Sequence, residues 1–224
     1  MFEFHSINST AYDNRNSPTT GKYWLIKTFE VLKGIQNDVV LDGTVYLDET
    51  YFTKVRSKLV TKDGKKLRGI SRNKIGVGVA CNETKSIFIV TGTSKPSRKS
   101  TKETYSQHIA RGSVLVHDDE HSHSILIEEL ELESIVYPTA ETKELSDKDN
   151  PLYPVNNLHL LLKQFIRNHG AYDREHLQDW LNLFWFIMNE PKDKYDKVLK
   201  FIEMAVLLPK KVRYRDAMSS KHSK

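Results

Sequence analysis

The sequence Val45-Tyr46-Leu47-Asp48-Glu49-Thr50-Tyr51-Phe52 is the clearest indication of the fold. Aromatic and β-branched residues dominate it, which is typical of a strand. Two acids, Asp48 and Glu49, stand within the apolar run. Because successive strand residues point to opposite faces of a sheet, only one of the two acids can face a given site. We expect a strand over residues 39–52 that presents Asp48, and we assign no metal to Glu49.

A second apolar run also leads to an acid, in Gly112-Ser113-Val114-Leu115-Val116-His117-Asp118. It predicts a short buried strand over 114–116, with Asp118 favoured over Asp119 because it comes first after the strand. The alternative is that these acids cap the next helix. Phosphodiester transfer benefits from two metal ions about 4 Å apart, and Mg²⁺ prefers oxygen ligands. If the two strands are neighbours, Asp48 and Asp118 lie close together and bind Mg²⁺ or Mn²⁺.

A third polar group lies on a helix expected over residues 154–168, where Pro154 favours the first turn. Asn156 and Lys163 are seven positions apart, about two helical turns, so they share one face, and His159 lies near it. An asparagine oxygen can bind Mg²⁺ but brings no negative charge. We expect Asn156 to complete the metal site and His159 and Lys163 to position phosphates. The alternative for Asn156 alone is an ordinary first-turn residue.

The remaining pattern places these groups in one architecture. Periodicity and turn signals predict strands over 73–81, 86–93 and 134–137, and helices over 22–33, 101–111, 121–132, 174–189 and 195–208. Residues 1–21 and 139–150 are expected to be irregular. The order of elements matches the ribonuclease H-like arrangement, an α/β fold in which helices flank a mixed sheet.

Composition limits the class of protein. The chain has 224 residues, a net charge of +5 and a single cysteine, Cys81. One cysteine excludes an internal disulfide framework and a cysteine-based zinc site, and it fits a reducing compartment. No apolar run reaches about 18 residues, so we expect no membrane partner and a cytoplasmic protein. The basic balance favours a polyanionic partner such as DNA.

Two smaller clusters have alternative interpretations. His121 and His123 form a His-x-His pattern that could suggest zinc, but without other ligands nearby we expect surface histidines. A basic cluster follows the third expected strand. It contacts a DNA backbone or is merely a solvated loop, and its members are Lys95, Arg98, Lys99 and Lys102.

Three motifs, in order, resemble the catalytic domain of DDE-type insertion-sequence transposases of the ISXO-like branch. They are Val-x-x-Asp-Glu-Thr-Tyr-Phe at 45–52, Gly-Ser-x-Leu-Val-x-Asp at 112–118 and Val-Asn-x-Leu-His-x-x-x-Lys at 155–163. The third position is Glu in some members and Asn in others, and Asn156 resembles the second group. The resemblance, over roughly residues 40–190, implies metal-dependent DNA cleavage and strand transfer. It also implies DNA partners, the transposon ends and a target, and a homo-oligomer in a transpososome.

The resemblance also frames the domain organisation. Family members usually carry a zinc ribbon and a helix-turn-helix, whereas this chain has no cysteine cluster. We therefore expect residues 1–38 to be a remnant of that DNA-binding region with a linker, 39–208 to be the catalytic domain and 209–224 a basic tail. Two alternatives stay open: a truncated or decayed DNA-binding protein without catalysis, and a ribonuclease H-like nuclease for structured RNA.

Overall fold

The computed structural model of the chain describes residues 7–53, 60–65, 67–146, 148–169, 176–189, 191–207 and 212–218. The chain divides into two compact units. The sheet unit comprises residues 36–161, and the helical unit comprises residues 1–35 and 162–224. Among the described residues, none of the helices combines the length and the apolar character needed to cross a membrane.

The sheet unit is built on five strands in the order β3-β2-β1-β4-β5. β1 pairs antiparallel with β2, β2 pairs antiparallel with β3, and β4 and β5 run parallel to β1. This mixed order is the ribonuclease H-like arrangement, so the predicted fold class is confirmed. The strands are β1 (Thr44–Thr53), β2 (Lys74–Cys81), β3 (Ser86–Thr93), β4 (Val114–His117) and β5 (Glu133–Val136).

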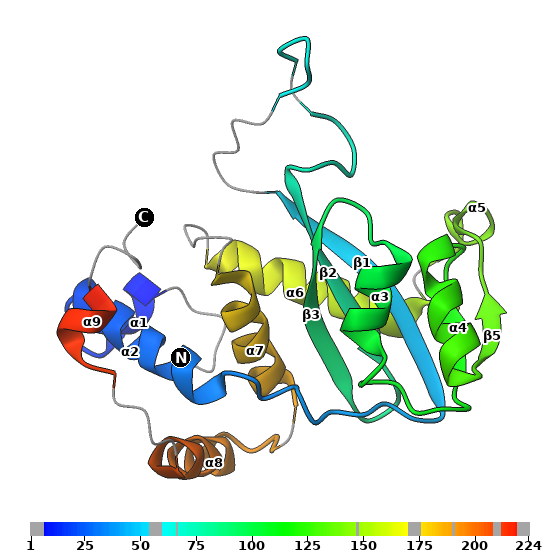
Figure 1. Cartoon of the computed structure of the whole chain (residues 1–224). Coiled ribbons are helices and arrows are strands. Elements are labelled where there is room, and N and C mark those ends of the chain that lie inside the picture. Colours follow the sequence, from blue (N-terminus) through cyan, green and yellow to red (C-terminus); the bar gives the residue numbers. More distant parts are fainter. Residues whose placement is uncertain are drawn as a thin grey trace. The chain divides into compact units, whose positions relative to one another are not determined.

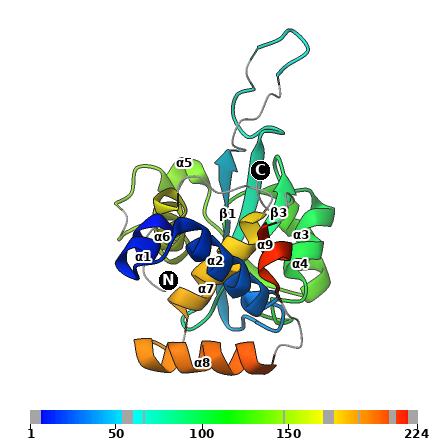
Figure 2. The same ribbon diagram turned by 90° about the vertical axis from the view of Figure 1, so that its left-hand side faces the viewer.

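Helices cover both faces of this sheet. α3 (Arg98–Tyr105) and α4 (Ser124–Leu130) lie on one face, and α6 (Tyr153–Asn168), which belongs to the sheet unit through Leu161, lies on the other (Figures 1 and 2). A short 3-10 helix, η1 (His121–His123), leads into α4, and α5 (Thr139–Thr142) follows β5. The core on the α3–α4 side includes Val45, Leu47, Tyr105, Leu115 and Leu126. Burial of these side chains holds β1 and β4 against the helices on this face.

The helical unit is held together by aromatic side chains. Phe29 and Trp180 pack edge to face with ring centroids 5.1 Å apart, and Phe165 and Phe184 lie 5.2 Å apart. The helix α7 (Leu177–Met188) buries Leu177, Leu181 and Phe184. The unit also contains α1 (Ile7–Asp13), α2 (Pro18–Leu32), α8 (Lys194–Leu207) and α9 (Tyr214–Met218).

Several expected boundaries were wrong, each for a local reason. Within the expected irregular segment 1–21, residues 7–13 form α1 and α2 begins at Pro18, where the Ser17 side chain accepts the Thr20 N–H; residues 1–6 lie outside the described residues. α3 begins earlier than expected because Ser97 and Ser100 form a capping box. β1 begins later, after Gly43 turns the chain with φ +67°. Short helices also occur at 139–142 and 214–218; of the expected tail, residues 209–211 and 219–224 lie outside the described residues.

Candidate functional site

Asp48 and Asp118 lie at neighbouring positions of two paired strands. The parallel register of β1 and β4 aligns Leu47 with His117, so the next residues along, Asp48 and Asp118, come side by side. Because strand side chains alternate, both acids leave the face on which Leu47 is buried. The prediction that the two strands are neighbours is confirmed.

Each carboxylate accepts a hydrogen bond from a nearby backbone N–H. Asp48 Oδ1 accepts the Glu49 N–H at 2.7 Å, and Asp118 Oδ1 accepts the Glu120 N–H at 3.2 Å. The alternative in which the acids cap the next helix does not hold, because Glu120 is the N-cap of η1 and its side chain makes no capping bond. Asp119 is exposed. Asp118 therefore holds a turn at the strand end.

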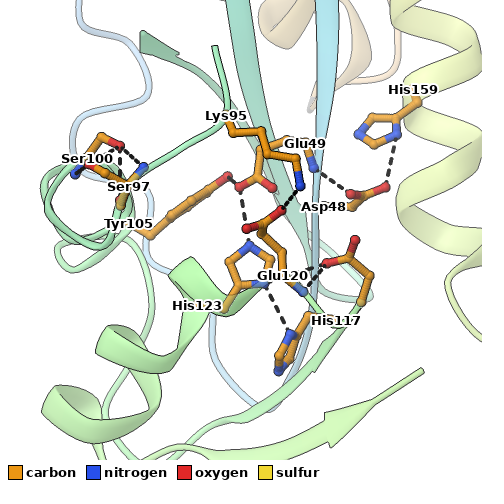
Figure 3. Close-up of polar contacts among 11 residues, drawn as sticks. Asp48, Glu49, Lys95, Ser97, Ser100, Tyr105, His117, Glu120, His123 and His159 are labelled. Carbon is orange, nitrogen blue, oxygen red and sulfur yellow. Dashed lines mark hydrogen bonds and ion pairs between the residues drawn. The ribbon is translucent and has the colours of Figure 1, made fainter. Parts of the chain in front are cut away.

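The contact from α6 to the acids is made by His159. Its Nδ1 lies 3.7 Å from Asp48 Oδ2, and the ring points at the carboxylate in Figure 3. Asn156, one turn earlier, is partly buried, and among the described contacts none joins its amide to either aspartate. Lys163 is exposed and belongs to the helical unit, so its contact with phosphate stays a prediction.

The surroundings of Asp48 and Asp118 disfavour the charged form of both carboxyl groups. Burial raises the pKa of Asp48 to about 7, and the negative charges of Asp118 and Glu49 add to the effect. Burial also raises the pKa of Asp118. A carboxylate whose pKa is raised by burial and by a neighbouring acid, as that of Asp48 is by Asp118, is suited to a cation, which would offset the repulsion. The oxygen donors of Asp48 and Asp118 fit the ligand preference of Mg²⁺ or Mn²⁺.

Glu49 points away from Asp48 into a buried hydrogen-bonded network, as strand alternation predicts (Figure 3). Its Oε1 accepts the Tyr105 hydroxyl at 2.9 Å and lies 3.3 Å from His123 Nε2. His123 Nδ1 is 3.1 Å from His117 Nδ1, and His117 Nε2 is 3.0 Å from Ser134 Oγ. This network connects β1, α3, η1, β4 and β5 on the α3–α4 face of the sheet.

The two histidines respond differently to this burial. Burial acts to lower the pKa of His123, but the hydrogen bond and charge of Glu49 outweigh it and raise the pKa overall. Burial lowers the pKa of His117 to about 4, and the nearby His123 adds to this. The expectation of surface histidines is correct for His121, which is exposed, and wrong for His123, which is fully buried. η1 places His123 Nε2 3.3 Å from Glu49 Oε1, a contact that the His-x-His pattern alone does not predict.

Gly78 makes room for this network. It pairs with Glu49 across the β1–β2 ladder. A Cβ at Gly78 would lie 2.0 Å from the Tyr105 hydroxyl oxygen and 2.7 Å from its Cζ. Only glycine therefore lets Tyr105 reach Glu49. The alternation of glycines with apolar residues in β2 is the one sequence signal that could have revealed the network.

The basic cluster near α3 is paired with glutamates throughout. The distances are 3.0, 2.6, 3.8 and 2.5 Å for the pairs Lys95–Glu120, Arg98–Glu128, Lys99–Glu103 and Lys102–Glu129. The pairs sit largely at the surface, where a single ion pair is weak. The partners offset the positive charge of the cluster, so contact with DNA stays a prediction.

Comparison with known proteins gives structural likenesses only. The chain is similar to the catalytic domain of Mos1 mariner transposase, with 13% identity and a TM-score of 0.41 over 90% of this chain and 93% of that one. It is similar to a pre-cleavage Mos1 transpososome, with 12% identity and a TM-score of 0.36 over 97% of this chain and 75% of that one. No family model and no curated protein matches the sequence. The strand order and pairing described above carry the fold assignment.

Proposed function

We propose that the chain is a DDE-type transposase, of the ISXO-like branch that its three motifs resemble, and that residues 39–208 form its catalytic domain. The observation that supports this best is the placement of Asp48 and Asp118 at adjacent positions of parallel strands, with the pKa of both carboxyls raised. Two such acids on a rigid sheet are what metal-dependent phosphoryl transfer needs.

In this proposal Asp48 and Asp118 hold Mg²⁺ or Mn²⁺. The bound ions would activate the attacking oxygen and stabilise the leaving oxygen. His159, 3.7 Å from the Asp48 carboxylate, orients that carboxylate. Asn156 contributes a neutral oxygen from the same helix, and Lys163 contacts a DNA phosphate.

The reaction proposed is hydrolysis of a phosphodiester followed by transesterification. A 3′-hydroxyl of the cut end attacks a target phosphorus, a new P–O bond forms, and the bond to the target strand's leaving 3′ oxygen breaks. The partners are transposon ends and target DNA, engaged by a homo-oligomer. The backbone hydrogen bonds to Asp48 Oδ1 and Asp118 Oδ1 hold the acids before substrate arrives, which lowers the cost of ordering the site during reaction.

The test is Mg²⁺-dependent nicking and strand transfer on DNA that carries the sequences flanking the coding region. Asp48→Asn and Asp118→Asn are expected to lose activity by at least about 1,000-fold, because each removes a charged ligand. Asp119→Asn is the matched control, since Asp119 is exposed and adjacent to Asp118. Unchanged activity in the first two variants would refute the assignment of Asp48 and Asp118 as metal ligands.

The same assay separates the alternatives. Salt-dependent DNA binding without Mg²⁺-dependent cleavage would favour a non-catalytic DNA-binding protein, for which the neutral Asn156 is the supporting feature. Offering an RNA–DNA hybrid beside duplex DNA tests the nuclease alternative. Cleavage of the hybrid alone would replace the transposase proposal.

A further inference from the structure

Three potential metal ligands converge where β4 ends. They are His117, the last residue of β4, then Asp118, and His123 at the end of η1. One ligand atom from each lies within 4.8 Å of the others. His117 Nδ1 and His123 Nδ1 are 3.1 Å apart, and His123 Nδ1 is 3.9 Å from Asp118 Oδ1.

The outer partners of the two rings aim these nitrogens at one another. His123 Nε2 faces Glu49 Oε1 at 3.3 Å, and a carboxylate can only accept, so the proton of a neutral His123 lies on Nε2. His117 Nε2 lies 3.0 Å from the Ser134 hydroxyl oxygen, which can accept a hydrogen bond from the Nε2–H of His117. Both Nδ1 atoms then carry lone pairs, and they lie 3.1 Å apart. Histidine ligands of metal ions are commonly held by such a bond from the second ring nitrogen.

We propose that His117, His123 and Asp118 form a second metal site, for a borderline divalent ion such as Zn²⁺, that shares Asp118 with the Asp48–Asp118 pair. Two imidazole nitrogens on a four-coordinate zinc ion lie roughly 3.3 Å apart, close to the 3.1 Å found here. Asp118 Oδ1, 3.9 Å from His123 Nδ1, supplies the third ligand. The site stands whether or not the Asp48–Asp118 pair is catalytic.

The donor set separates this site from the magnesium site. Imidazole nitrogen favours Zn²⁺, Co²⁺ or Ni²⁺, whereas Mg²⁺ prefers oxygen. The His123 side chain is fully buried and His117 is nearly so, while the Asp118 side chain is 27% exposed. An ion would therefore enter along Asp118 and be bound by two rings whose orientation is already fixed.

The direct test is a Co²⁺ titration of the metal-free full-length chain, followed by visible absorption. We expect one saturable band set that Zn²⁺ displaces and a large excess of Mg²⁺ does not. His123→Gln and His117→Gln should weaken binding by about 10–100-fold or more, since each removes a ring held by an outer partner. His121→Gln is the matched control, because His121 is exposed and two residues from His123.

Two further readouts keep the proposal falsifiable. X-ray absorption of the Zn²⁺ adduct of the unaltered protein should show two imidazole ligands, which needs no variant to fold. Asp48→Asn should abolish strand transfer yet keep the Co²⁺ spectrum, so failure of the proposed function and failure of this site are distinguishable. No saturable Co²⁺ binding, fewer than two imidazoles, or equal Co²⁺ affinity in His123→Gln would overturn the site and leave the two rings joined by a simple hydrogen bond.

Discussion

Asp48 and Glu49 are consecutive acids on one strand, and the two faces of the sheet treat them in opposite ways. On the α6 face, the Asp48 side chain is 25% exposed and lies beside Asp118 and His159. On the α3–α4 face, the Glu49 side chain is 4% exposed and meets Tyr105 and His123. The strand pleat alone separates the two environments.

The contrast distinguishes a carboxylate suited to binding a cation from one that stabilises the fold. Glu49 is supplied with hydrogen-bond donors by its own fold, so its buried carboxylate is compensated without a ligand. Asp48 has another acid as a neighbour, and its pKa is raised to about 7. A carboxylate left with uncompensated repulsion is the one that gains most from a bound cation.

The largest expected effect is a pH dependence of stability that comes from Asp48. Its carboxyl has an ordinary pKa of 3.8 in the unfolded chain and about 7 in the fold. Between these values only the folded state holds the proton, so the free energy of unfolding falls as pH rises and levels off above about 7. The loss is at most about 4 kcal/mol. Urea unfolding of the metal-free protein from pH 4 to 8 measures it.

The Asp48→Asn variant isolates this contribution from other titrating groups. It should be more stable than the unaltered protein at pH 8, and the gap should close toward pH 4. Saturating Mg²⁺ should narrow the gap at pH 8 if Asp48 binds the ion in the folded state. Parallel pH profiles of the two proteins would refute the assignment of the raised pKa to Asp48.

The next effect concerns the other face, where Glu49→Ala removes the acceptor shared by Tyr105 and His123. Both donors would then be buried without that carboxylate, and we expect a loss of about 3 kcal/mol in the free energy of unfolding. Chemical denaturation monitored by circular dichroism measures it. Glu128→Ala is the control, because both side chains of its pair with Arg98 are exposed and its loss should cost less than about 1 kcal/mol. Equal losses in the two variants would contradict a special role for the buried network.

Gly78→Ala tests the space that the network needs. The new Cβ would lie 2.0 Å from the Tyr105 hydroxyl, and overpacking of this kind costs about 2 kcal/mol. Gly76→Ala is the matched control in the same strand: its nearest neighbour is the end of the Thr91 side chain at 2.5 Å, which can rotate. A Tyr105→Phe change in the Gly78→Ala background should recover part of the loss. Thermal unfolding of the four proteins makes the comparison, and an identical cost at both glycines would rule out the close approach of Tyr105.

The two faces also differ in how far the sequence could predict them. Asp48 and Asp118 could be predicted as site residues, because each stands in or directly after an apolar run, and the pairing of the two strands brings them together. The network of Glu49 does not follow, because it joins residues 49, 105, 117, 123 and 134, whose proximity depends on packing between α3, η1 and the sheet. His123 stands at the polar start of the expected helix over 121–132, and nothing in the pattern there indicates that η1 buries its ring. The helix α1 was missed because its seven residues are mostly polar and show no clear apolar period.

The smallest effect concerns the surface beside the Glu49 face, where Lys102 pairs with Glu129 at 2.5 Å. Both side chains are at least one-third exposed, so Lys102→Ala should change the free energy of unfolding by less than about 0.5 kcal/mol. If the cluster binds a DNA backbone, the same change should weaken DNA binding about 2–5-fold and reduce its salt dependence. Glu129→Gln should strengthen binding by a similar factor, because it frees the lysine. Fluorescence anisotropy of a labelled duplex at two salt concentrations measures both, and unchanged affinity in the two variants would leave α3 as a solvated surface.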